Sequence, residues 1–123
     1  MNTSLTDYLE VNVDALATEV TRQMEDERPE LFRRYRDRSG GSGKDPAEWC
    51  REDTAFHLRH LAAALDSGDS EEFEAYRSWL VGLLGARGIP VDDINANFKA
   101  IGDVLTARLG DEGRPAVSVL RSR

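Results

Sequence analysis

Apolar residues recur every three or four positions over most of the chain, and this spacing limits the fold more than any other feature. The first segment carries Leu9, Val13, Leu16, Val20 and Met24 at such steps. Because 3.6 residues complete a helical turn, these side chains share one face of an α-helix. No segment shows the strict apolar–polar alternation with hairpin turns that is typical of β-strands. The spacing therefore predicts an all-α protein.

Capping residues mark the expected limits of the first three helices. Thr6 or Asp7 can cap the first segment, because short oxygen-bearing side chains accept from free backbone N–H groups. Pro29 is suited to the first turn of a second, short helix. Asp45, which stands directly before a proline, is expected to cap a third helix that runs to about Leu65.

Two further helices have similar boundary signals. Gly68 ends the third helix, and Asp69 or Ser70 begins the fourth. Gly88 is expected to close the fourth helix in a left-handed conformation, and Asp92 to cap the fifth. The connections after the third and fourth helices are short, which predicts that these helices are antiparallel neighbours.

The length of 123 residues corresponds to one ordinary domain. We therefore expect residues 1–123 to form a single bundle of four main helices and one short helix. Glycine and serine predict a flexible loop at 38–45. The tail at 111–123 is compatible with a last helical turn or two and also with an extended arm.

The net charge of −7 argues against nucleic acid as a partner, because a phosphate backbone would be repelled by most of the surface. A short basic exception consists of Arg33, Arg34, Arg36 and Arg38. Acidic residues come directly before it, so a solvated helix face of mixed charge is the simpler interpretation. A docking patch for an acidic partner is the alternative.

The features that report on location point to the cytoplasm. Cys50 is the single cysteine, which excludes an internal disulfide and suggests a reducing compartment. The first ten residues lack the basic and apolar regions of a secretory signal. No apolar run approaches the roughly 18 to 20 residues that span a bilayer, so we expect no membrane association.

The rarest residues gather in the third helix, in the stretch WCREDTAFHLRH at 49–60. Asp53, His57 and His60 stand four and three residues apart, so a helix places them on one stripe. A metal site needs further ligands from other helices, and we predict none. One interpretation is structural: Phe56, His57 and Leu61 face the core, with His57 bonded to Asp53 or to a backbone carbonyl.

The alternative interpretation is a ligand pocket between the third and fourth helices. Aromatic walls with a few polar groups are typical of small-molecule sites. The ligand would be a small aromatic molecule or a tetrapyrrole such as haem or a bilin, with His57 as the axial ligand and His60 as the substitute. The candidate ligand-binding residues are Trp49, Asp53, Phe56, His57, His60, Tyr76 and Trp79.

Catalysis has less support in the sequence. Cys50 and His57 are two helical turns apart, about 10 Å of rise, which is too far for a thiol–imidazole pair. The carboxylates fall at helix starts and on outer faces, so no acid–base pair stands out. We predict no catalytic residues.

The segments CREDTAFHLRHLAAAL and FEAYRSWLVGLLGARGIPVDDI resemble a known helical module. This module precedes the cobalamin-binding domain in bacterial B12-dependent regulators and photoreceptors, where a tryptophan and a Glu-His pair cap the corrin. The resemblance places Trp49 and His57 at those positions, although Phe56 stands where the family has Glu. The Asp-x-His-x-x-Gly signature of the cobalamin domain does not occur in this chain. The resemblance therefore implies a stand-alone sensory or regulatory module.

Three functional hypotheses follow. The first is a non-enzymatic, cytoplasmic sensory or regulatory module that acts through contact with a partner protein or by dimerisation. The second is a sensor that binds a small aromatic molecule or a tetrapyrrole between the third and fourth helices. The third is an enzyme whose active site the sequence does not reveal.

Overall fold

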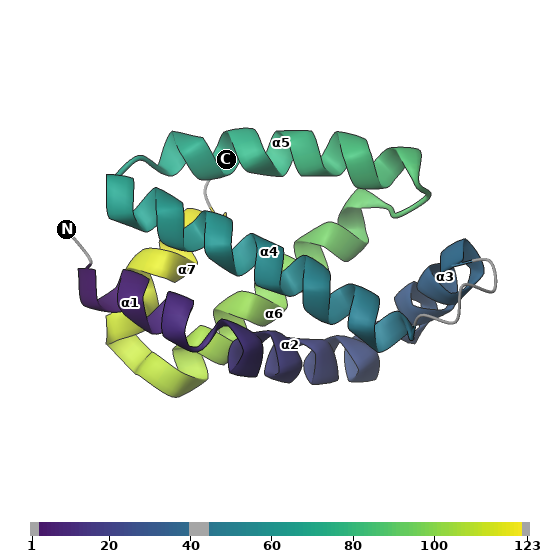
Figure 1. Cartoon of the computed structure of the whole chain (residues 1–123), viewed down its shortest axis with the longest axis horizontal. Coiled ribbons are helices and arrows are strands. Elements are labelled where there is room, and N and C mark those ends of the chain that lie inside the picture. The colour runs from purple at the N-terminus through teal and green to yellow at the C-terminus, as the bar shows by residue number, and fades with distance from the viewer. Residues whose placement is uncertain (1–2, 40–44, 122–123) are drawn as a thin grey trace.

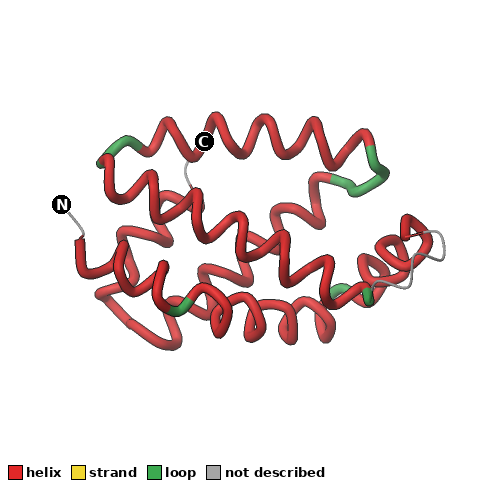
Figure 2. Tube along the Cα trace, viewed as in Figure 1, coloured by secondary structure: helices red, strands yellow, loops and turns green. Residues whose placement is uncertain are grey.

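The computed structural model describes residues 3–39 and 45–121 of the chain. Within these ranges every regular element is helical, so the predicted all-α class is confirmed (Figure 2). The predicted loop at 38–45 lies mostly outside the described residues. The elements in chain order are α1 (Thr3–Val11), α2 (Val13–Glu27), α3 (Pro29–Ser39), α4 (Pro46–Ser67), α5 (Ser70–Ala86), α6 (Val91–Leu109), the 3-10 helix η1 (Gly110–Gly113) and α7 (Arg114–Arg121).

The longest helix, α4, lies at the centre of the arrangement. It packs against α1 and α2 along one side and against α5 along the other (Figure 1). Helix α6 packs against α2 and α7, while α3 lies at one end of the molecule beside the start of α4 (Figure 1). Consequently α4 contributes side chains to the core and also to the surface that it shares with α5.

The core is one continuous cluster that forms from the predicted helical faces. Leu9, Leu16, Val20 and Met24 are all buried, while Val13 is half-buried. Burying one such side chain contributes roughly 1.5–3 kcal/mol to folding. The spacing of the apolar residues therefore predicts correctly which face of the N-terminal segment is buried.

The N-terminal segment is nevertheless two helices, because the regular conformation breaks at Asn12, where φ is −103° and ψ is 16°. The side-chain amide of Asn12 donates to the Tyr8 carbonyl at 2.9 Å. Asparagine favours such local bonds over a continuous helix. Thr6 and Asp7 lie inside α1, so the prediction that one of them caps the first helix is wrong.

The C-terminal tail is helical in the part that the structure describes. Gly110 ends α6 at φ 57°, and η1 turns the chain into α7. Ala116 and Leu120 are four residues apart and both buried, and α7 packs on α6. The predicted count of four main helices and one short helix is therefore wrong, because the break at Asn12 and the folded tail both add helices.

The predicted caps of α4 and α5 are confirmed. The Asp45 carboxylate accepts from the Ala47 N–H at 2.9 Å. The Asp69 carboxylate accepts from the Glu71 N–H at 3.0 Å. These bonds satisfy amides that a helix leaves without intrahelical partners.

At the turn from α5 to α6, the predicted left-handed Gly88 is confirmed and the predicted Asp92 cap is wrong. Gly88 has φ 86°, as expected for a left-handed turn, and the Ile89 N–H donates to the Leu84 carbonyl at 2.9 Å. Asp92 does not cap α6, because the N-cap is Pro90 without a side-chain bond.

Among residues 3–39 and 45–121, no helix combines the length and apolarity needed to cross a membrane.

Candidate functional site

An open aromatic groove of about 480 Å³ runs between α4 and α5. Two of its side chains are well exposed for their size, Phe56 at 44% and Trp79 at 53%. Exposed apolar side chains that line a common groove are typical of a binding surface. The residues that line the groove are Phe56, His60, Ala63, Glu72, Ala75, Tyr76 and Trp79.

The rings of the groove contact one another in sequence. His60 stacks on Tyr76 with ring centroids 4.0 Å apart and an interplanar angle of 10°. Phe56 meets His60 edge-on at 4.8 Å, and Trp79 lies 6.1 Å from Tyr76. Helical spacing produces this row, because Phe56 and His60 are four residues apart on α4 and Tyr76 and Trp79 three apart on α5. The result is a continuous aromatic wall.

A buried polar pair lies beneath this wall. The Nδ1 atom of His57 is 2.5 Å from the hydroxyl oxygen of Tyr76. Burial lowers the pKa of His57 to about 3, although a hydrogen bond with Asn97 acts in the opposite direction. Burial also raises the pKa of Tyr76, with a smaller contribution from the charge of Asp53. Both groups are therefore neutral at physiological pH.

The structure brings together some of the predicted site residues and separates the others. Phe56, His60, Tyr76 and Trp79 line the groove. His57 is only 2% exposed and belongs to the core below it.

Two predicted residues lie elsewhere. Asp53 lines a small cavity together with His57 and Asn97, on the side toward α6. Trp49 is half-buried at the start of α4 and packs against the core. Neither is among the residues that line the groove.

Three residues of the groove were missed by the sequence analysis, namely Ala63, Glu72 and Ala75. Glu72 lies in the first turn of α5, where a negative charge is favourable in any helix. Its spacing of four residues from Tyr76 is the signal that could have identified it. The alanines could not have been found this way, since small residues carry no chemical signature.

A second polar cluster explains part of the basic run at 33–38. Asp93 is 5% exposed and pairs with Arg28 at 3.3 Å and with Arg34. These contacts join α6 to α3 and to the end of α2. Arg34 is thus an ion-pair partner of Asp93, although Arg33, Arg34 and Arg36 all remain exposed.

The described residues contain no group of three or more His, Cys, Asp or Glu side chains that could hold a metal ion. Cys50 is buried with a free thiol. Burial raises its pKa to about 11, so the thiolate that would act as nucleophile is scarce at neutral pH. The chemistry that this region offers is therefore ring stacking, apolar burial, the His60 imidazole and one carboxylate.

No family model, no curated protein and no solved structure matches the chain.

Proposed function

We propose that the chain is a non-enzymatic sensory or regulatory module of the cytoplasm that binds a small planar aromatic molecule in the groove between α4 and α5. The observation that carries this proposal is the exposure of Phe56 and Trp79 next to the stacked His60–Tyr76 pair. A flat ligand would cover these rings and remove their surface from water, which contributes about 25 cal/mol per Å². Ring-to-ring contacts contribute about 0.5–1.5 kcal/mol each in addition.

Charge narrows the class of ligand to planar aromatic cations. Glu72 places a carboxylate on the groove, and the chain as a whole carries a net charge of −7. The faces of Phe56, Tyr76 and Trp79 also attract cations through their quadrupoles. The volume of about 480 Å³ suits a ligand of a few fused rings.

The regulatory role is supported by two further observations. The chain resembles the helical module of bacterial B12-dependent sensory proteins in the segments that form α4 and α5. Ligand contacts on Tyr76 would reach the core directly, because its hydroxyl bonds to buried His57. A bound molecule could thus change how α5 packs on α4, and a partner protein would detect that change.

A cytoplasmic location fits the free, buried thiol of Cys50.

The two tryptophans allow a direct test. In the Trp49→Phe variant, the fluorescence reports Trp79 in the groove, whereas Trp79→Phe leaves Trp49 as the matched reporter outside it. Titration with proflavine, a planar aromatic cation, should quench Trp79 with a saturable curve in the micromolar range and leave Trp49 nearly unchanged. Anthracene-9-carboxylate, which is planar but anionic, should bind at least about tenfold more weakly because of Glu72.

A blocking variant separates the groove from other surfaces. Ala75→Gln fills the groove and should abolish the quenching, while Ala86→Gln, on an exposed position at the end of the same helix, should not. Equal quenching in both variants would overturn the proposal. If Trp79 emission instead changes with protein concentration alone, and Ala75→Gln removes that change, a second copy of the chain covers the groove and the module acts by dimerisation.

Haemin titration tests the tetrapyrrole alternative. His57 is buried below the groove, so His60 is the imidazole that the groove itself offers. A Soret band that appears on titration and is lost in His60→Gln would identify a tetrapyrrole ligand. The absence of such a band, together with proflavine binding, favours a smaller aromatic cation.

A further inference from the structure

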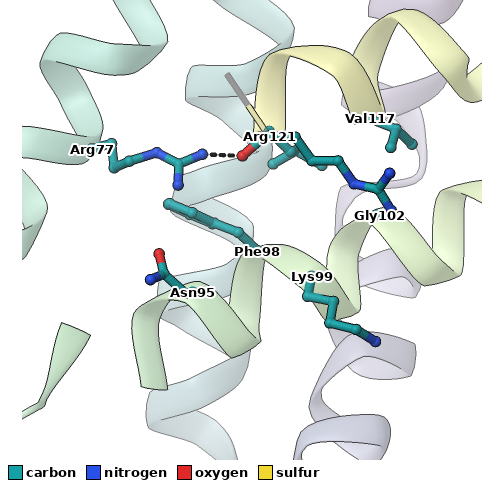
Figure 3. Close-up of a pocket in the computed structure, with 8 residues that line it drawn as sticks. Arg77, Asn95, Phe98, Lys99, Gly102, Val117 and Arg121 are labelled. Carbon is teal, nitrogen blue, oxygen red and sulfur yellow. Dashed lines mark hydrogen bonds between the residues drawn. The ribbon is translucent and has the colours of Figure 1, made fainter. Parts of the chain in front are cut away.

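A recess of about 460 Å³ lies where α5, α6 and α7 meet, and it shares no lining residue with the aromatic groove (Figure 3). Arg77 extends from α5 on one side of Phe98, while Lys99 and Arg121 lie on the other side (Figure 3). The residues that line the recess are Arg77, Asn95, Phe98, Lys99, Gly102, Val117, Leu120 and Arg121.

The charge of this recess is opposite to that of the chain. Three cationic side chains from three helices surround it, although the chain has 16 basic and 23 acidic residues. Among the described residues that line the recess, none carries a carboxylate. Asp103 lies outside the lining, where it pairs with Lys99 at 2.9 Å and offsets part of the charge. That hydrogen bond raises the pKa of Lys99, so the ammonium stays charged at neutral pH.

Arg77 is ordered by its contacts within the chain. Its guanidinium carbon lies 4.6 Å from the centre of the Phe98 ring, a cation–π contact. Its Nη2 also donates to the backbone carbonyl of Leu120 (Figure 3). These two contacts fix Arg77 as the α5 wall of the recess. The recess is therefore preorganised on its α5 side.

The rest of the lining is suited to an organic group. Phe98, Val117 and Leu120 supply apolar surface, and Asn95 supplies an amide that can donate or accept. A free inorganic anion would use the cations and leave this apolar surface exposed to water. An anion that carries an organic part would use both halves of the recess.

We infer that the recess between α5, α6 and α7 binds a small phosphate monoester. The phosphate lies beside Lys99 and Arg121, and the organic part lies against Phe98 and Val117. A phosphate monoester carries close to two negative charges at neutral pH, which matches several cations better than one carboxylate does. Guanidinium groups also match phosphate oxygens in geometry. This inference does not depend on the aromatic groove.

Isothermal titration of the whole chain with phenyl phosphate tests the inference, with inorganic phosphate and phenol as the two partial ligands. Phenyl phosphate should bind saturably with a dissociation constant of about 0.1 mM, at least about tenfold tighter than either partial ligand. The affinity should fall as sodium chloride is added, because salt screens exposed charges. Absence of saturable binding at millimolar phenyl phosphate, or equal affinity for inorganic phosphate, would overturn the inference.

Two arginines of α7 provide a matched pair of variants. Arg121→Gln removes a cation that lines the recess and should weaken phenyl phosphate binding about tenfold. Arg114→Gln removes the same charge from an exposed position and should change the affinity for phenyl phosphate less than about twofold. Equal effects of the two variants would show a nonspecific charge effect and contradict the inference. Ala75→Gln, which blocks the aromatic groove, should leave this binding unchanged, so the two proposals fail independently.

Discussion

The Nδ1 atom of His57 and the hydroxyl oxygen of Tyr76 lie 2.5 Å apart across the contact between α4 and α5. Both residues are buried, and the Tyr76 ring stacks on His60 in the aromatic groove. One tyrosine thus takes part in a buried polar contact through its hydroxyl and in a surface groove through its ring. The stability of the core and the shape of the groove are linked at this position.

Tyr76→Phe should destabilise the fold by about 1–3 kcal/mol, because it leaves a polar nitrogen of His57 buried without this partner. Tyr8→Phe is the matched control, since the Tyr8 hydroxyl contacts exposed Arg108 and its loss should cost less than about 0.5 kcal/mol. Urea denaturation followed by circular dichroism measures both values. Equal losses in the two variants would contradict a structural role for the His57–Tyr76 contact.

His57 should make the fold less stable as the pH falls. Burial lowers its pKa from 6.5 to about 3. Between these two pH values the His57 imidazole binds a proton in the unfolded chain but not in the folded chain. The contribution of neutral His57 to the free energy of unfolding is fully present above pH 6.5. Below pH 6.5 the free energy of unfolding declines by roughly 1.4 kcal/mol per pH unit. Urea denaturation between about pH 5.5 and 7.5 avoids most carboxylate titration. His57→Gln should flatten this dependence, and His60→Gln should retain most of it.

Asp93→Asn should destabilise the fold by about 1–2 kcal/mol, because it removes the buried carboxylate charge that pairs with the partly exposed Arg28 and Arg34. The neighbouring Asp92 is exposed and makes no cap bond, so Asp92→Asn should change the stability by less than about 0.5 kcal/mol. Thermal unfolding of the two variants gives the comparison. A loss for Asp92→Asn as large as that for Asp93→Asn would show that Asp93 has no special role.

Two glycines should respond to alanine in opposite directions. A Cβ at Gly113 would lie 3.1 Å from the Leu105 carbonyl oxygen and 3.3 Å from the Leu109 Cβ, so Gly113→Ala should destabilise the fold by about 1 kcal/mol. A Cβ at Gly82, inside α5, would meet nothing within 4 Å. Gly82→Ala should therefore stabilise by about 0.5–1 kcal/mol through helix propensity. Stabilisation by Gly113→Ala would contradict the close packing of η1 on α6.

Much of the helical framework could be predicted because its signals are local. Asp45 and Asp69 bond to amides two residues away, and Gly88 takes a conformation that other residues avoid. The break at Asn12 could not be predicted from spacing, since the apolar face continues through it. The ion pairs of Asp93 could not be predicted either, because its partners are about sixty residues distant in the chain.

The candidate site was predicted only in part, for a related reason. The helical period relates the directions of Phe56, His57 and His60 on one helix, but it does not say which neighbour covers each direction. In the folded chain Tyr76 and Phe98 enclose His57, whereas Phe56 remains 44% exposed. Of the two interpretations of Phe56, the one that turns it toward the core is therefore wrong, and the one that places it in a groove with Tyr76 and Trp79 agrees with the fold.

The sequence by itself determined that the chain is helical and where α4 and α5 begin and end. Periodicity and capping determine these properties within a few turns of one helix. Only the tertiary structure decided that His57 is buried while Trp79 is exposed, and that Arg77, Lys99 and Arg121 share one recess. Burial and the meeting of charges from different helices depend on how the helices pack, because each side chain is covered by residues far away in the chain.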